Sequence, residues 1–248
     1  FLALVLFWVG ASETREIGIS KTKGEETANH KGLPSKNPSS FPFGIGEKLV
    51  FEISWFGITA GKSELTVKEK TLYQSREVYR LVSQTTGGGA MGKLYPVDDR
   101  LESFIDVRGL FPYYALLRQR EGKRKKDKDV YFDQENQQIT YVTNGGRPRV
   151  LSAPPQVMDI LSSLYYFRTQ DLKVGKSIPM RVFSLKHNFE VAVKVLSKEI
   201  MEVLSVKREV FLVKPHITLN SAPSPYRKGE VLLWLTADEK KLPVKIRA

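Results

Sequence analysis

The chain has 248 residues, with 39 lysines and arginines against 27 aspartates and glutamates, so its formal net charge is +12 at pH 7. It contains no cysteine, which excludes structural disulfides, cysteine-bound metals, thiol nucleophiles and a lipoprotein anchor. Hydrophobic residues make up 41% of the chain, which is enough for one substantial core. We therefore expect a single folded domain, with or without a tail.

Residues 1–11 form an uncharged apolar run that is too short for a membrane-spanning helix, which needs roughly 20 residues. The run is typical of the core of a signal peptide, and Val9 and Ala11 are small residues placed for cleavage before Ser12. We expect a Sec-type signal remnant, export to the periplasm and a chain that begins partway through its gene product. A buried N-terminal strand is the alternative.

Residues 12–40 mix charges of both signs with glycine, proline and serine, and they contain almost no large apolar side chains. Such a composition buries too little apolar surface to offset the entropy of ordering. It predicts a disordered spacer over 12–40, followed by a single β-rich domain over 41–248.

Apolar residues alternate with polar ones along most of this domain. Leu49, Phe51, Ile53 and Trp55 form one such run, and residues 189–195 form another. Similar runs lie at 61–69, 77–85, 99–106, 113–121, 125–133, 137–142, 178–184, 206–214, 229–236 and 242–247. Many short strands separated by turns predict an all-β, mainly antiparallel protein, folded as a curved sheet or an open β-barrel.

One segment has the spacing of a helix instead. Val157, Ile160, Leu161 and Leu164 fall at positions i, i+3, i+4 and i+7, which puts them on one stripe. This predicts one amphipathic helix over about 155–168, with a proline in its first turn. A lone helix in a β protein is expected to cover one end of the sheet.

Glycines at 87–92 precede Lys93, which approaches the pattern of a phosphate-binding loop. However, Leu94 occupies the position of the magnesium-binding hydroxyl, and Pro96 opposes a following helix. A flexible glycine-rich connection between strands is the better interpretation.

The remaining candidates for chemistry are few. The histidines are isolated in the sequence and show no metal-ligand spacing: His30, His187 and His216. Four carboxylates lie close together and could serve glycoside chemistry, although acidic residues near turns usually flank strands: Asp98, Asp99, Glu102 and Asp106. We expect no enzyme activity, no catalytic residue, no metal site and no cofactor.

Basic residues crowd one predicted hairpin and are opposed there only by Glu121 and Asp127. They are Arg118, Arg120, Lys123, Arg124, Lys125, Lys126 and Lys128. Near an anionic membrane each basic residue contributes about 1 kcal/mol, so the hairpin is a candidate for binding an anionic lipid or glycan surface. A solvated edge that prevents aggregation is the alternative. Export, and a hairpin tip without aromatic residues, argue against nucleic acid.

Four motifs occur in order along the domain: FGIGEKLVF at 43–51, WFGITAG at 55–61, DILSSLYYFR at 159–168 and LWLTADEKKLPVKI at 233–246. Together they resemble DUF3108, a bacterial envelope family of unknown function. The resemblance implies an exported protein with a barrel-like antiparallel β fold and no catalytic residues to transfer. It also implies a further strand beyond Ala248, so we expect the chain to stop early.

These observations lead to two hypotheses. The first is a non-enzymatic periplasmic protein that binds an apolar or amphiphilic envelope molecule, a lipid or lipid-linked glycan, inside the curved sheet. Its expected pocket residues are Trp55, Leu164, Tyr165, Phe167 and Trp234. The second is a scaffold that contacts envelope proteins during envelope assembly or polysaccharide export. A void of about 300 to 1,000 Å³ would favour the first, and a solid core the second.

Overall fold

The computed structural model describes residues 15–23, 41–184, 186–218 and 231–247. Its elements in these ranges are β1 (Arg15–Lys23), β2 (Lys48–Trp55), β3 (Ile58–Tyr73), β4 (Arg76–Gly87), α2 (Gly89–Leu94), β5 (Asp98–Asp106), β6 (Pro112–Glu121), β7 (Arg124–Asp133), β8 (Gln138–Thr143), β9 (Arg149–Ser152), α3 (Ile160–Arg168), β10 (Ser177–Ser184), β11 (His187–Val203), β12 (Val206–Thr218), β13 (Leu232–Thr236) and β14 (Pro243–Arg247). The predicted strands are all present, with bounds shifted by a few residues.

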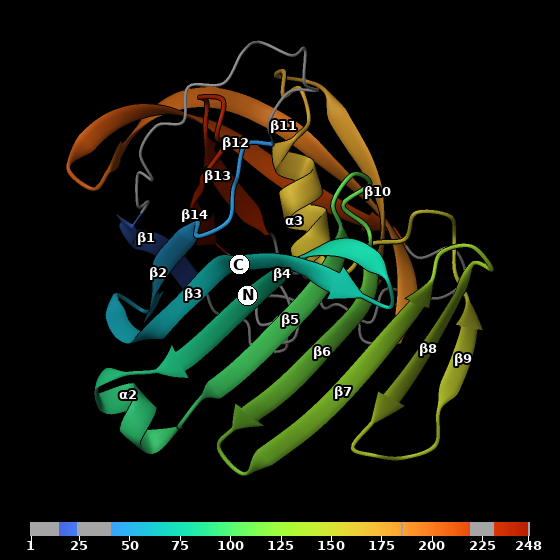
Figure 1. Cartoon of the computed structure of the whole chain (residues 1–248). Coiled ribbons are helices and arrows are strands. Elements are labelled where there is room, and N and C mark those ends of the chain that lie inside the picture. Colours follow the sequence, from blue (N-terminus) through green and yellow to red (C-terminus); the bar gives the residue numbers. More distant parts are fainter. Residues whose placement is uncertain (1–14, 24–40, 185, 219–230, 248) are drawn as a thin grey trace, which may run out of the picture.

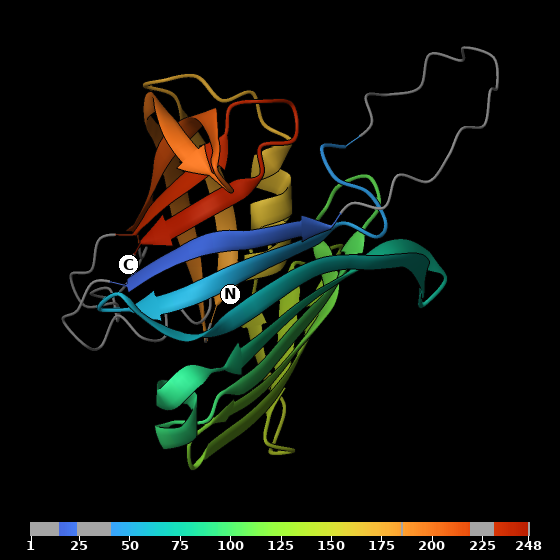
Figure 2. The same cartoon turned by 90° about the vertical axis from the view of Figure 1, so that its left-hand side faces the viewer.

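The strands form one antiparallel sheet in the order β10-β11-β12-β13-β14-β1-β2-β3-β4-β5-β6-β7-β8-β9. The sheet curves so strongly that its two halves face each other across α3 (Figure 1), and a view from the side shows the same arrangement (Figure 2). No strand pairing joins the edge strands β9 and β10 within the described residues. The predicted fold class, an open and mainly antiparallel β structure, is confirmed.

The structure differs from the expected spacer at residues 15–23, which form β1. This strand pairs with β14 through Ile17 and Ile246 and with β2 through Ile17 and Ile53. It therefore joins the two halves of the sheet. The composition of residues 12–40 did not predict this strand, because the strands that pair with β1 lie far away in the sequence.

The main hydrophobic core lies between the two halves of the sheet and α3. One half contributes Leu65, Leu81 and Ile105, and the other contributes Val195 and Leu235. These side chains are almost completely buried and pack with the apolar side of the helix. Side chains that alternate along each strand thus enclose the only long helix in the described part of the chain.

Helix α3 begins at Ile160, later than the predicted start at 155. Asp159 is its N-cap: its carboxylate accepts from the Ser162 backbone N–H at 2.7 Å, and the Ser162 hydroxyl accepts from the Asp159 N–H at 2.9 Å. The residue before it, Met158, is held by the edge strand, because its N–H donates to Arg181 O and its carbonyl accepts from Phe183 N–H. This pairing keeps the preceding turn out of the helix.

The other end of α3 is tied to distant segments by Arg168. Its guanidinium is fully buried and donates to both carboxylate oxygens of Glu47, at 2.7 and 2.8 Å. It also donates to the carbonyls of Pro42 at 2.9 Å and Lys240 at 3.2 Å. One side chain therefore joins the helix, the segment before β2 and the turn between β13 and β14.

The glycine-rich segment forms a short helix, α2, where a flexible connection was expected. Its glycines permit close backbone approach. A Cβ on Gly61 would lie 2.4 Å from Thr86 O, and one on Gly92 would lie 2.8 Å from Gly87 C. Close packing of β3, β4 and α2 therefore explains these glycines without any bound phosphate.

Candidate ligand-binding site

The structure brings together three of the five predicted pocket residues. Leu164, Tyr165 and Phe167 are buried in the main core, where they pack against both halves of the sheet. Trp234 lies on the opposite face of β13 in a separate cluster, and its indole N–H donates to Glu199. Trp55 is the last residue of β2, and its side chain lies outside the described part of the chain. Leu164, Tyr165 and Phe167 therefore lie in a different cluster from Trp234.

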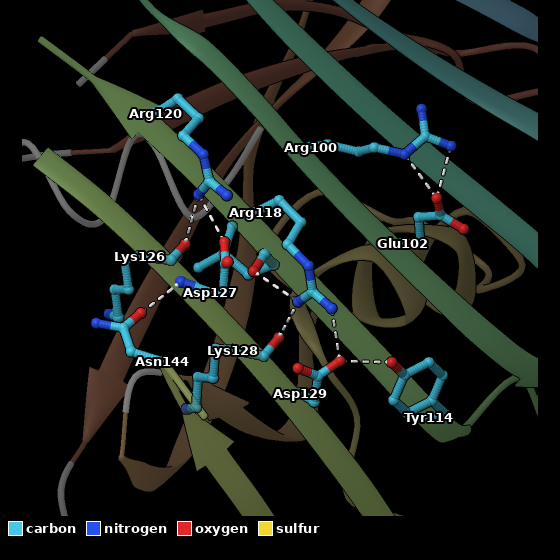
Figure 3. A network of polar contacts seen from close by, with 11 residues as sticks. Arg100, Glu102, Tyr114, Arg118, Arg120, Lys126, Asp127, Lys128, Asp129 and Asn144 are labelled. Carbon is cyan, nitrogen blue, oxygen red and sulfur yellow. Dashed lines mark hydrogen bonds and ion pairs between the residues drawn. The ribbon is translucent and has the colours of Figure 1, made fainter. Parts of the chain in front are cut away.

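The basic hairpin of β6 and β7 divides its charges between two faces. On the outer face, away from α3, Arg120 donates to Asp127 at 2.6 Å and Arg118 donates to Asp129 at 2.9 Å (Figure 3). The hydrogen bond from Arg120 lowers the pKa of Asp127. These two arginines therefore belong to a ladder of ion pairs within the hairpin. Lys123, Arg124 and Lys125 are exposed at the tip.

Lys126 and Lys128 lie on the inner face of the same hairpin. Lys128 is 5% exposed, and its Nζ lies 4.4 Å from the ring centroid of Tyr141 and 4.6 Å from that of Phe183. Burial, and then the charges of Lys126 and Lys186, lower the pKa of Lys128 to about 7. Burial also lowers the pKa of Lys126. The faces of the two rings offset only part of the cost of burying the charged amine.

These lysines line a cleft of about 60 Å³ between the inner face of β5 to β7, the N-terminus of α3 and β10. Its apolar walls include Leu101, Ala115 and Val130. We call this the inner cleft. It combines an apolar lining with two amines and with the carboxyl group of Asp159, which accepts hydrogen bonds from Ser103 and Ser162. The two amines suit a ligand that has an apolar part and an anionic group.

A second polar group lies farther along the inner face. Asp99 and Glu121 are buried, and Asp99 accepts from the Arg120 backbone N–H at 2.7 Å. Burial, with a smaller contribution from the charge of Glu121, raises the pKa of Asp99 to about 6, against the effect of that hydrogen bond. The side-chain oxygen of Gln119 is buried nearby without a hydrogen-bond partner in the described structure.

The other carboxylates of this region do not join Asp99. Glu102 lies on the outer face, where it accepts from Arg80 at 2.7 Å, and Asp98 accepts from Gln84. Asp106 accepts from backbone N–H groups of the turn after β5. Strand alternation thus separates the acidic residues, and in the described ranges no three histidine, aspartate or glutamate side chains could hold a metal ion.

Sequence reasoning missed how the inner cleft is assembled. Period-two alternation along β7 could have separated Lys126 and Lys128 from Lys125, because neighbours on a strand point to opposite faces. No sequence signal placed Phe183 or Lys186 beside them. Those two residues come from the opposite edge of the sheet, so only the curvature brings them close.

Together, the fold and the inner cleft define an all-β protein of open-barrel type with an amphipathic cleft where its two sheet edges approach. None of the helices in the described ranges has the length and apolar character needed to cross a membrane.

The family model described as "Protein of unknown function (DUF3108)" matches residues 50–248, so this chain belongs to the DUF3108 family. The fold is similar to a crystal structure described as a β-barrel-like protein of domain of unknown function DUF1849 from Brucella abortus. That similarity has 9% identity and a TM-score of 0.45, and covers 95% of this chain and 92% of the other. No curated protein matches the chain.

Proposed function

We propose that this protein is a non-enzymatic periplasmic binding protein for an apolar or amphiphilic envelope molecule, such as a lipid or lipid-linked glycan. The observation that carries the proposal is the pair of amines, Lys126 and Lys128, inside a cleft with apolar walls. An anionic group there would relieve the repulsion between the amines, and its attraction to them would be strengthened by low local dielectric.

The size of the inner cleft determines how a ligand could enter. At about 60 Å³ it is far smaller than the roughly 300 to 1,000 Å³ of sites for drug-sized ligands. Contacts between side chains hold the two sheet edges together here, including the ring of Phe183 against Phe132 and Tyr141. Asn188 also donates to Ser152 O at 2.8 Å. We propose that this seam separates to admit the apolar part of the ligand, because β9 and β10 are not paired in the described structure and the backbone link to β10 there is the single bridge between Met158 and Val182.

The exposed tip of the hairpin adds a second element to the proposal. Lys123, Arg124 and Lys125 project at the end of β6 and β7, outside the ion-pair ladder of Arg118 and Arg120. We propose that the tip approaches an anionic envelope surface while the inner lysines hold the head group of the ligand.

The test combines identification of bound lipid with binding of a defined probe. Protein purified from an envelope fraction is examined by native mass spectrometry and lipid extraction, and titrated with dodecyl phosphate. We expect Lys128→Met to weaken dodecyl phosphate binding about tenfold or more, and Lys123→Met to leave it unchanged. Absence of co-purified lipid together with absence of probe binding would contradict the proposal.

The second candidate function is a scaffold that acts by protein contact in envelope assembly or polysaccharide export. Two observations favour it: the main core packs buried side chains from both halves of the sheet and from α3, and the β11–β12 hairpin exposes Ile200, Leu204 and Val206. Exposed apolar side chains gathered at one tip are a feature of contact surfaces. This function predicts crosslinks to envelope proteins that survive delipidation and are lost in Ile200→Glu, with no effect of Lys128→Met.

A further inference from the structure

A second cleft, of about 210 Å³, opens on the opposite side of the sheet from the inner cleft. It lies between the turn that joins β3 to β4 and the turn that joins β7 to β8. We call it the outer cleft. Its lining combines three tyrosines with charged and amide side chains, including Tyr73, Tyr113, Tyr131, Arg76 and Glu135.

The aromatic side of the outer cleft belongs to a stack of rings across neighbouring strands. Tyr131 is 43% exposed, and its ring centroid lies 5.2 Å from that of Tyr114. Tyr114 is parallel to Tyr73 within 3°, at 5.6 Å, and Phe104 packs against both. Stacking of this kind restricts ring motion, so Tyr131 presents a fixed apolar surface to solvent.

The polar side of the outer cleft is equally well ordered. Arg76 donates to Glu135 at 2.8 Å, which links the two turns, and its guanidinium lies 4.8 Å from the ring centroid of Tyr113. Asn136 donates to Asp133 through both its backbone N–H and its side-chain amide. Gln134 donates to two backbone carbonyls.

One polar atom in the outer cleft lacks a partner. The side-chain oxygen of Gln134 is buried, and it has no hydrogen-bond partner within the described residues. A buried acceptor without a donor is costly, so a hydroxyl group or a water at this position would be favoured.

The turns themselves hold the outer cleft in shape. Gln74 and Ser75 have φ values of +48° and +65°, a left-handed pair that forms a tight hairpin turn. Gln137 has φ of +52° in the facing turn. Neither turn needs to rearrange for the cleft to exist, which reduces the entropy lost on binding.

We propose that the outer cleft binds one unit of a neutral or N-acetylated saccharide. A sugar ring offers a C–H face that packs on an aromatic ring and a rim of hydroxyls that pair with amide, carboxylate and guanidinium groups. Tyr131 supplies the first surface, and Gln74, Glu135 and Arg76 supply the second. An anionic ligand would meet the carboxylates of Asp133 and Glu135, and an acyl chain would leave these polar groups unpaired.

The outer cleft shares only Phe132 with the lining of the inner cleft, so the proposal stands whether or not the protein carries a lipid. The full chain is titrated with chitotetraose and with maltotetraose, and binding is measured by calorimetry and by saturation-transfer NMR. We expect at least one to bind with a Kd of about 1 mM or lower, the range of a single well-placed ring. Binding of neither at about 10 mM would overturn the proposal.

Variants locate the binding. We expect Tyr131→Ala to weaken it about tenfold and Tyr131→Phe to retain it, because the ring face carries the contact. Phe56→Ala, which removes a 64% exposed ring at the β2–β3 turn, is the matched control and should bind normally. Equal loss in Phe56→Ala and Tyr131→Ala would overturn the assignment to this cleft.

A further variant guards against misfolding of Tyr131→Ala. Gln74→Asn keeps a residue type that tolerates the left-handed conformation and withdraws the amide from the cleft. We expect about threefold weaker binding from it, with an unchanged urea midpoint. Full affinity in both Gln74→Asn and a folded Tyr131→Ala would contradict the proposal.

Discussion

Each end of α3 carries a buried ionisable side chain, yet the two ends are built differently. At the C-terminal end, the Arg168 guanidinium is satisfied by Glu47 and by two backbone carbonyls. At the N-terminal end, Asp159 is held by backbone and hydroxyl donors and lines the inner cleft together with Lys126 and Lys128. At the C-terminal end, the buried guanidinium is paired and has a structural role. At the N-terminal end, two amines lie beside a cleft.

The largest effect is expected at the C-terminal end. Arg168→Ala should lower the free energy of unfolding by about 3 to 5 kcal/mol, because it leaves the Glu47 carboxylate without its buried partner. Urea denaturation measures the loss. Glu47→Gln keeps the shape and removes the charge, so it should also destabilise strongly. A loss below about 1 kcal/mol in both variants would show that the pair of Arg168 and Glu47 does not stabilise this end of the helix.

At the N-terminal end, Asp159→Ala should cost about 2 kcal/mol, because it removes the N-cap of α3 and the acceptor of the Ser103 hydroxyl. Asp159→Asn keeps an N-cap oxygen and should cost less. Thermal unfolding of the two variants separates the capping contribution from the charge. Equal losses in the two would contradict a role in capping.

Lys128→Met should stabilise the protein by about 1 to 2 kcal/mol near pH 7, because it removes a buried amine from an apolar wall. The sign follows from the pKa, which is about 7 in the folded protein and about 10.4 in an unfolded chain. Between these values the unfolded chain binds more protons, so the cost of burying the charge is complete below about pH 7 and vanishes above about pH 10.

Urea midpoints of wild type and Lys128→Met across this pH range measure the effect. The gain from the variant should shrink steadily as the pH rises, and Lys123→Met, at the exposed tip, should show no such trend. A gain that grows with pH would contradict the account of the inner cleft. Stabilisation combined with loss of dodecyl phosphate binding would show that the amine is kept for function.

The smallest effect is expected on the outer face. Arg120→Ala should lower the urea midpoint only slightly, because its ion pair with Asp127 is exposed to solvent. The remaining difference should decrease in about 1 M salt, where charges are screened within a few ångströms. A large loss of stability that does not depend on salt would show that Arg120 stabilises the fold as the buried Arg168 does.

Alternation along the chain was sufficient to predict most strands, as in residues 189–195, because a half-buried strand must place apolar residues at every second position. The stripe that includes Leu161 and Leu164 likewise predicted the only long helix in the described ranges. Periodicity did not find β1 or the later start of α3. Both depend on backbone partners remote in the sequence: β14 for the strand and β10 for Met158.

The candidate sites were predictable only in part. A cluster of basic residues on one hairpin was visible in the sequence, but its division into an outer ladder and inner amines required the register of β6 with β7. The outer cleft left no sequence signal, because Tyr73 and Tyr131 are 58 positions apart in the numbering and meet only through strand order.

The amino-acid sequence by itself determined the class of fold, the family and the absence of cysteine chemistry, because periodicity, motifs and composition are local properties. The tertiary structure decided which charges are paired and which face a cleft. Arg168, which the sequence shows only as the last residue of a motif, is a buried ion-pair partner of Glu47. Lys128, one of seven basic residues in a row of charges, is the amine between two rings. Burial and pairing depend on curvature, which no local pattern encodes.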